Sequence, residues 1–164
     1  MILKFFELKE KNIKENRYFL LYGNNKGLIE EIIEKKIKPQ MTNNVYRYDE
    51  NEIIKDVDRF EDSISNKSFF DNEKLIIISR VTNKIFKIIE EIIEKKIDDV
   101  SLILISEFLE KKSKLRVFFE KKNNTVCVPF YEDTLQTLSN LTTNFLKEKK
   151  ISLSQQNINL LIEK

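Results

Sequence analysis

The chain has 164 residues, of which 41% are hydrophobic, enough for one substantial domain with a real core. Its 29 basic and 27 acidic side chains nearly cancel to a net charge of +2, so no overall field draws it to nucleic acid or to an anionic membrane. It has no histidine, which removes the commonest general base and metal ligand. Its one cysteine, Cys127, excludes an internal disulfide and a multi-cysteine zinc site, and we expect it to be a buried apolar side chain.

Short apolar runs alternate with amphipathic stretches over the first 130 residues. In chain order the pattern predicts a strand at 17–22, a helix at 28–38, a strand at 45–48, a helix at 51–63, a strand at 75–79, a helix at 84–97, a strand at 100–105, a helix at 113–122 and a strand at 125–128. Strands with nearly continuous apolar runs, separated by helices, are typical of a parallel sheet covered on both faces. We therefore predict a doubly wound α/β domain over residues 1–130.

The pattern becomes purely helical after Pro129. A helix is expected over 131–149, with leucines at helical spacing, and a further helix begins after Ser154, a suitable N-cap. Residues 131–164 are too few to enclose a core of their own, so we expect them to be an incomplete helical domain.

The sequence shows no membrane span or signal peptide. Nowhere do about 18 apolar residues follow one another, and charge interrupts the N-terminal apolar run too soon for a signal peptide. We therefore expect a cytoplasmic chain.

One nine-residue segment occurs twice. The residues Ile-Glu-Glu-Ile-Ile-Glu-Lys-Lys-Ile stand at 29–37 and again at 89–97. We interpret them as two amphipathic helices of similar composition and not as a duplicated functional unit.

The segment from Gly23 to Glu30 has the setting of a phosphate-binding loop, between a strand and a helix, but not its sequence. Counted from Gly23, the places for the motif's last Gly, Lys and Ser/Thr hold Leu28, Ile29 and Glu30. Lys26 and Gly27 stay open as a possible anion site. The strands at 75–79 and 100–105 lead into Arg80 and Glu107 and not into paired acids, so no catalytic, metal or cofactor constellation can be assembled. The sequence favours a binding protein.

Phe69 and Phe70 are adjacent in an otherwise polar stretch, residues 63–74, directly before an expected strand. Two aromatic rings on a surface loop reduce solubility unless a partner or the core covers them. The pair therefore indicates a binding site. The alternative is that one ring folds inward as the first core residue of the strand, since neighbouring strand residues face opposite sides.

An ordered set of segments along the chain resembles the delta subunit of the bacterial DNA polymerase III clamp loader. The segments are Phe-Leu-Leu-Tyr-Gly-Asn at 19–24, Leu-Ile-Glu-Glu at 28–31, Tyr-Arg-Tyr-Asp at 46–49, Ser-Phe-Phe-Asp-Asn-Glu-Lys-Leu-Ile-Ile-Ile at 68–78, Ser-Leu-Ile-Leu-Ile at 101–105, Glu-Lys-Lys-Ser-Lys-Leu at 110–115 and Lys-Lys-Ile-Ser-Leu-Ser at 149–154. The resemblance covers essentially the whole chain.

The resemblance implies an AAA+-like domain that has lost nucleotide binding, followed by the start of a small helical lid, with the C-terminal collar domain absent. It implies a non-catalytic subunit that acts in DNA replication and opens the ring-shaped sliding clamp. Its partners would be the clamp, other clamp-loader subunits and, within the assembled complex, DNA. Phe69 and Phe70, preceded by Ser68, match the apolar pair that inserts into the clamp. Ser65 stands where some members have glutamine.

Two other functions are weighed against clamp binding. One is a P-loop nucleotide hydrolase with a degenerate motif. The other is a nucleic-acid-binding module that uses the basic run Lys111, Lys112, Lys114, Arg116, Lys121 and Lys122. The plain interpretation of that run is a solvated helix face with Glu110 and Glu120 as partners.

Overall fold

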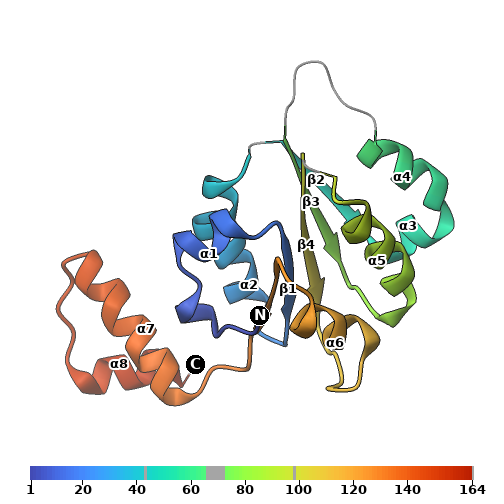
Figure 1. Cartoon of the computed structure of the whole chain (residues 1–164). Coiled ribbons are helices and arrows are strands. Elements are labelled where there is room, and N and C mark those ends of the chain that lie inside the picture. Colours follow the sequence, from blue (N-terminus) through green and yellow to red (C-terminus); the bar gives the residue numbers. More distant parts are fainter. Residues whose placement is uncertain (43, 66–72, 98, 164) are drawn as a thin grey trace. The chain divides into compact units, whose positions relative to one another are not determined.

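The computed structural model describes residues 1–42, 44–65, 73–97 and 99–163. The chain divides into two compact units, Met1–Phe130 and Tyr131–Lys164. In the described part of the first unit, five strands form one parallel sheet in the order β2-β3-β4-β1-β5 (Figure 1). The strands are β1 (Tyr18–Tyr22), β2 (Val45–Asp49), β3 (Lys74–Ser79), β4 (Val100–Ser106) and β5 (Thr125–Pro129). The predicted doubly wound parallel sheet is confirmed.

Helices cover both faces of the sheet because alternate strand residues point to opposite sides. The helices of the first unit are α1 (Glu10–Glu15), α2 (Lys26–Ile32), α3 (Glu50–Lys55), α4 (Val57–Ser65), α5 (Phe86–Lys95) and α6 (Lys114–Lys121). Phe19 and Leu21 of β1 pack in the cluster that includes α1 and α2, and Leu20 between them packs in the cluster of α3 to α6. The two helical layers lie on opposite sides of the strands in Figure 1.

Cys127 is fully buried on β5, as expected, and burial raises the pKa of its thiol to about 12.

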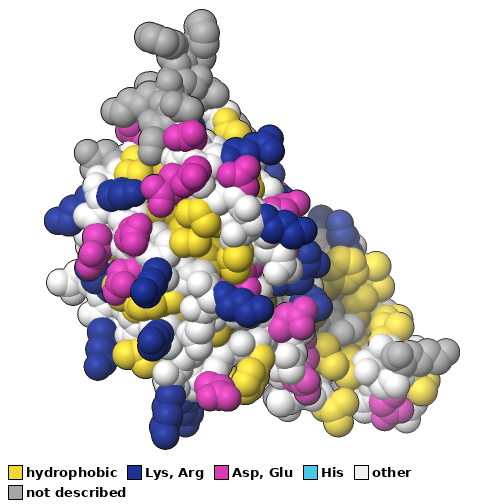
Figure 2. All heavy atoms as spheres, turned by 90° about the vertical axis from the view of Figure 1, so that its right-hand side faces the viewer, with side chains coloured by type: hydrophobic (Ala, Val, Ile, Leu, Met, Phe, Trp, Pro, Cys, Tyr) yellow, Lys and Arg dark blue, Asp and Glu magenta, His cyan; other side chains and the backbone are white. Residues whose placement is uncertain are grey.

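The surface of the first unit carries charges of both signs. Lys, Arg, Asp and Glu side chains are interspersed over the face that carries α3 to α6 (Figure 2). This mixing agrees with the small net charge, and no single-sign field covers that face.

Several helix limits differ from the sequence prediction. The helix expected at 51–63 is two helices, because Asp56 leaves the helical conformation and its Oδ1 accepts a hydrogen bond from the Arg59 backbone N–H at 3.1 Å. The helix expected at 28–38 begins at Lys26, and after Ile32 it continues as a π turn, Ile33–Ile37, and a 3-10 turn, Lys38–Gln40. Helix α1 was not predicted from the sequence.

The second unit contains helices α7 (Leu135–Glu148) and α8 (Gln155–Ile162). Helix α7 begins four residues later than the predicted residue 131, because Thr134 caps it in a reciprocal pair of hydrogen bonds with Thr137. Leu146 and Ile158 are buried, whereas several large apolar side chains of this unit are exposed. Its interpretation as part of a lid domain stays a prediction.

Candidate functional site

Strand β1 lies where the winding of the sheet reverses. From β1 the chain crosses to β2 at the far edge, returns through β3 and β4, and then passes β1 to reach β5. Ligands of doubly wound folds bind outside the carboxyl ends of the strands at such a reversal. The loops that follow β1 and β4 meet at this end of the sheet. A nucleotide site of this fold class would therefore lie between them.

Gly23, directly after β1, serves a close passage of two backbone segments. Its φ is +140°, and a Cβ at this position would lie 1.8 Å from the carbonyl oxygen of Phe130. Its N–H donates to the Ser106 carbonyl at 3.0 Å, and the Phe130 N–H donates to the Tyr22 carbonyl at 2.7 Å. The close packing of these two backbone segments explains why position 23 needs glycine, and a phosphate-binding role is not required to explain it.

Lys26, the first residue of α2, is neutralised from the opposite loop. Its Nζ lies 2.6 Å from Oε1 of Glu107, which follows β4. This hydrogen bond and the attraction of the lysine charge hold the pKa of Glu107 below its usual value. Ile29, at the place of the P-loop lysine, is 1% exposed and packs in the core. The anion site left open at Lys26 and Gly27 therefore has a carboxylate beside its lysine.

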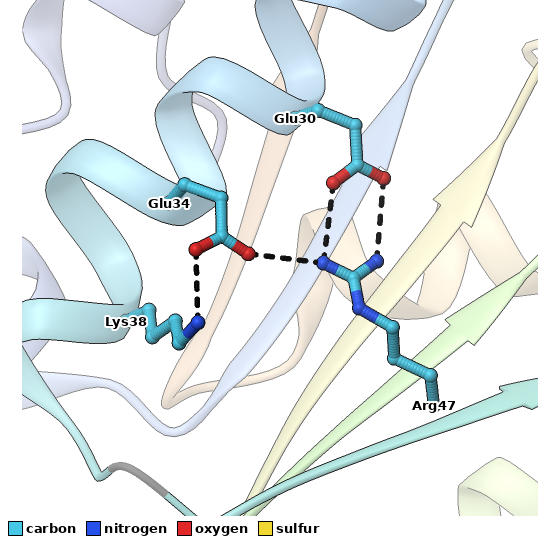
Figure 3. Close-up of polar contacts among 4 residues, drawn as sticks. All are labelled: Glu30, Glu34, Lys38 and Arg47. Carbon is cyan, nitrogen blue, oxygen red and sulfur yellow. Dashed lines mark hydrogen bonds and ion pairs between the residues drawn. The ribbon is translucent and has the colours of Figure 1, made fainter.

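Glu30, at the place of the P-loop Ser/Thr, pairs with the edge strand β2. The Arg47 guanidinium donates to both carboxylate oxygens of Glu30, at 3.4 and 3.2 Å, and to Glu34 at 3.1 Å (Figure 3). Lys38 Nζ donates to the other oxygen of Glu34 at 2.9 Å. Hydrogen bonding to Glu30 is the main cause that raises the pKa of Arg47. This network holds α2 and the turn after it against β2.

The end of β3 carries a cation where a nucleotide hydrolase would place a metal-binding acid. Arg80 has a φ of 58°, and its Nε donates to Oδ2 of Asp49 at 2.6 Å. Burial opposes ionisation of the Asp49 carboxyl, but hydrogen bonds from Asn51 and Arg80 outweigh it and lower the pKa. The neighbouring Glu50 is 3% exposed and accepts a hydrogen bond from the Thr82 N–H at 2.6 Å. These carboxylates join elements and are already paired.

The hollow at this end of the sheet is small. It has a volume of about 200 Å³ and is lined by Lys26, Arg80 and Glu107 among others. Small-molecule sites usually have about 300–1,000 Å³. Across residues 1–42, 44–65, 73–97 and 99–163, no group of three or more acidic, cysteine or histidine side chains could hold a metal ion. The hollow is thus smaller than most small-molecule sites, and its two cations, Lys26 and Arg80, are each paired with a carboxylate.

The predicted clamp-binding residues Ser68, Phe69 and Phe70 lie outside the described residues, between α4 and β3. The elements on both sides are joined to one another. Lys74 Nζ, at the start of β3, donates to the Ser63 carbonyl of α4 at 2.8 Å. The amino end of β3 lies opposite the Lys26–Glu107 pair at the other end of the sheet.

A groove follows α3 and α4 beside the edge strand β2. It has a volume of about 520 Å³, and its lining includes Arg47, Arg59, Phe60 and Ser63. The Tyr48 ring stands edge-on to Phe60 at 5.1 Å between centroids, and its hydroxyl donates to Ser63 Oγ at 3.2 Å. The groove thus reaches the last turn of α4. No sequence signal pointed to it, because its residues come from three separate elements.

The basic run expected as a possible DNA contact has two roles in the structure. Arg116 faces the protein, since its Nε donates to Glu120 at 2.7 Å and its guanidinium lies 4.8 Å from the centroid of the Tyr22 ring. Lys122 Nζ donates to Glu94 at 3.4 Å. Four lysines of the run are exposed, namely Lys111, Lys112, Lys114 and Lys121. The run is therefore not one continuous cationic surface.

Comparison with known proteins identifies the fold class. No protein-family model matches the chain, and no curated protein gives a significant sequence match. The DNA clamp loader delta protein of Bacillus subtilis has a similar structure, with a TM-score of 0.64 and 16% sequence identity over 93% of this chain and 50% of that one. This chain thus spans about half the length of that protein. The AAA+-like fold expected from the sequence resemblance is confirmed.

A second solved structure has a lower score. Domain III of the Thermotoga maritima replication initiation protein DnaA gives a TM-score of 0.48 at 12% identity, over 94% of this chain and 71% of that chain.

In the part of the chain that the structure describes, no helix has the length and apolar character needed to span a membrane.

Proposed function

We propose that this chain contains the sliding-clamp-binding part of a clamp-loader delta subunit and acts in DNA replication. The observation that carries the proposal is the sequence Ser68-Phe69-Phe70 between α4 and β3 of an AAA+-like fold. The fold similarity to a DNA clamp loader delta protein and the ordered sequence resemblance support it. Other clamp-loader subunits are proposed partners, DNA is contacted only within the assembled complex, and the chain works in the cytoplasm.

The proposed contact has enough apolar surface to be a binding hot spot. Burying two phenylalanine side chains is worth about 3–6 kcal/mol before the cost of association is subtracted. Single interface residues that cost about 2 kcal/mol or more on truncation dominate many complexes. The hydrogen bond from Lys74 to the Ser63 carbonyl joins the two elements that flank the pair in the sequence.

The subunit needs no nucleotide for this role. A clamp ring is shifted towards an open or distorted form by any partner that binds that form more tightly than the closed one. The Lys26–Glu107 pair and the buried Ile29 occupy the places where a nucleotide hydrolase would hold phosphate. We therefore infer a non-catalytic subunit and do not favour the degenerate P-loop enzyme.

Absence of ATP binding is a direct prediction from this end of the sheet. Calorimetric titration of the chain with ATP and Mg²⁺ should give no heat of binding in the micromolar range. Saturable micromolar binding that is lost in Lys26→Ala would show that the loop after β1 still holds phosphate and would overturn the prediction.

Clamp binding itself is tested by surface plasmon resonance with the chain immobilised and the cognate sliding clamp in solution. We expect saturable binding of the intact ring. A folded, correctly immobilised chain that captures no clamp at micromolar concentration would overturn the proposed function.

A further inference from the structure

Helix α6 carries more apolar surface than the sheet covers. Leu115 and Phe119 are buried in the core. Val117 and Phe118, on a neighbouring stripe of the same helix, are only half-buried. An amphipathic helix that covers a sheet needs one apolar stripe, so the second one is in excess.

This second stripe forms one wall of a groove, and Phe86 at the start of α5 forms the other. The groove has a volume of about 410 Å³, and its inner surface is almost entirely apolar. The rings of Phe86 and Phe118 meet edge-to-face with their centroids 5.7 Å apart. A space of this size accepts one or two large apolar side chains and leaves the backbone that carries them at the surface.

Hydrogen bonds hold the two walls in a fixed relation. Asn83, just before α5, accepts from the Ser113 hydroxyl at 2.9 Å and from the Leu115 N–H at 3.2 Å. Ser113 in turn caps α6 by accepting from the Arg116 N–H at 3.2 Å. The starts of α5 and α6 are thus joined through one amide side chain. A groove with fixed walls binds a ligand without first being ordered.

The rim of the groove is basic. Lys114, Lys121 and Lys122 line it, and the Nζ of Lys122 lies 5.3 Å from the centroid of the Phe118 ring. Lys122 also contacts Glu94, but Lys114 and Lys121 pair with no carboxylate among the residues that the structure describes. The two unpaired ammonium groups lie one helical turn on either side of Val117 and Phe118. Their position favours a ligand with negative charge on both sides of an apolar anchor.

We propose that this groove binds a peptide segment of a partner protein in which one or two large apolar side chains are flanked by Asp or Glu. An acidic peptide satisfies the lysine rim, while its apolar side chains pack in the groove against Val117 and the touching rings of Phe86 and Phe118. Nucleic acid fits less well, because the groove has an apolar interior and Arg116, the arginine of α6, is turned towards Glu120 and Tyr22. This site shares no residue with Ser68, Phe69 and Phe70, and the proposal does not depend on clamp binding.

Fluorescence anisotropy with a short labelled peptide, in which aspartates flank a Leu-Phe pair, tests the proposal on the complete chain. Binding should weaken at least about tenfold when the peptide carries Ala-Ala in place of Leu-Phe, as expected for loss of an apolar anchor. Lys114→Glu/Lys121→Glu changes exposed side chains, and it should weaken binding about tenfold while thermal unfolding is unchanged. Lys36→Glu/Lys55→Glu alters net charge equally at exposed positions away from the groove and should leave binding unchanged.

Phe118→Ala should abolish peptide binding, and circular dichroism checks that this variant is folded. The proposal is overturned if the peptide does not bind, or if both charge-reversal variants weaken it equally. It is also overturned if a labelled single-stranded oligonucleotide binds more tightly than the peptide and is released by Lys114→Glu/Lys121→Glu.

Discussion

Gly23 and Gly27 lie in the same loop and first helical turn, but their environments are opposite. A Cβ at Gly23 would lie 1.8 Å from the Phe130 carbonyl oxygen on a backbone with positive φ, whereas a Cβ at Gly27 would meet nothing within 4 Å. Gly23→Ala should therefore lower the free energy of unfolding by about 3 kcal/mol or more. Gly27→Ala should raise it by about 0.5–1 kcal/mol, because alanine favours the helix. Urea denaturation measures both, and equal effects would contradict the role of Gly23.

The Lys26–Glu107 pair should be visible in the titration of Glu107. Its pKa is held below the ordinary value of 4.5 mainly by the hydrogen bond from Lys26. A carboxyl with a lowered pKa stabilises the fold at pH values above its unfolded pKa, and this contribution disappears as the pH falls through the folded pKa. Lys26→Met should therefore raise the pKa of Glu107 towards 4.5. A carboxyl-detected NMR titration checks the shift, and an unchanged pKa would show that the pair does not form in solution.

Two identical nine-residue segments show how far local sequence determines a helix. In the copy at 29–37 the α-helix passes at Ile32 into a π turn and then into a 3-10 turn that contains Pro39. In the copy at 89–97 the α-helix runs to Lys95 and ends at Lys96, whose φ is 45°. Ile37 is fully buried, but its counterpart Ile97 is half-buried. The sequence predicted a helix in both places, while the residues that follow and the packing decide where each one ends.

The contacts between elements were harder to foresee than the elements themselves. Lys26, at the start of α2, and Glu107, after β4, are far apart in the chain, and they meet because β1 and β4 are neighbours in the sheet. Apolar runs give strands but not their order, so this pair could not be predicted from the sequence. The split at Asp56 carries a local signal, an aspartate before a polar helix start, which the continuous helical period concealed.

The two helices of the second unit should be less stable than the sheet. Within that unit, Leu146 and Ile158 are buried, whereas Leu135, Phe145 and Leu160 are more than half exposed. Little buried apolar surface means that the helices open at low free energy. In native-state hydrogen exchange, the amides of α7 and α8 should therefore exchange well before those of β1, β3 and β4. Equal protection in the two units would contradict this expectation.

At the scale of the whole molecule, the sequence was sufficient for the fold class because apolar runs and helical stretches alternate through the first 130 residues. The sequence also lacks the phosphate motif, since Ile29 and Glu30 occupy the places of its Lys and Ser/Thr, and the structure uses Ile29 for the core and Glu30 for pairing with Arg47. The groove between α5 and α6 escaped prediction because its walls come from two helices. The roles of Phe69 and Phe70 stay predictions.

The affinity of a double variant for the clamp tests the central claim most directly. Phe69→Ala/Phe70→Ala should weaken binding of the cognate sliding clamp at least about tenfold and leave the free energy of unfolding nearly unchanged, because the rings are proposed to contact the partner and not the core. The matched control is Phe6→Ala/Phe108→Ala, which removes two exposed aromatic rings from other elements and should bind the clamp as the unaltered chain does. Unchanged clamp affinity in the first variant, or a loss of several kcal/mol in its folding stability, would contradict the account.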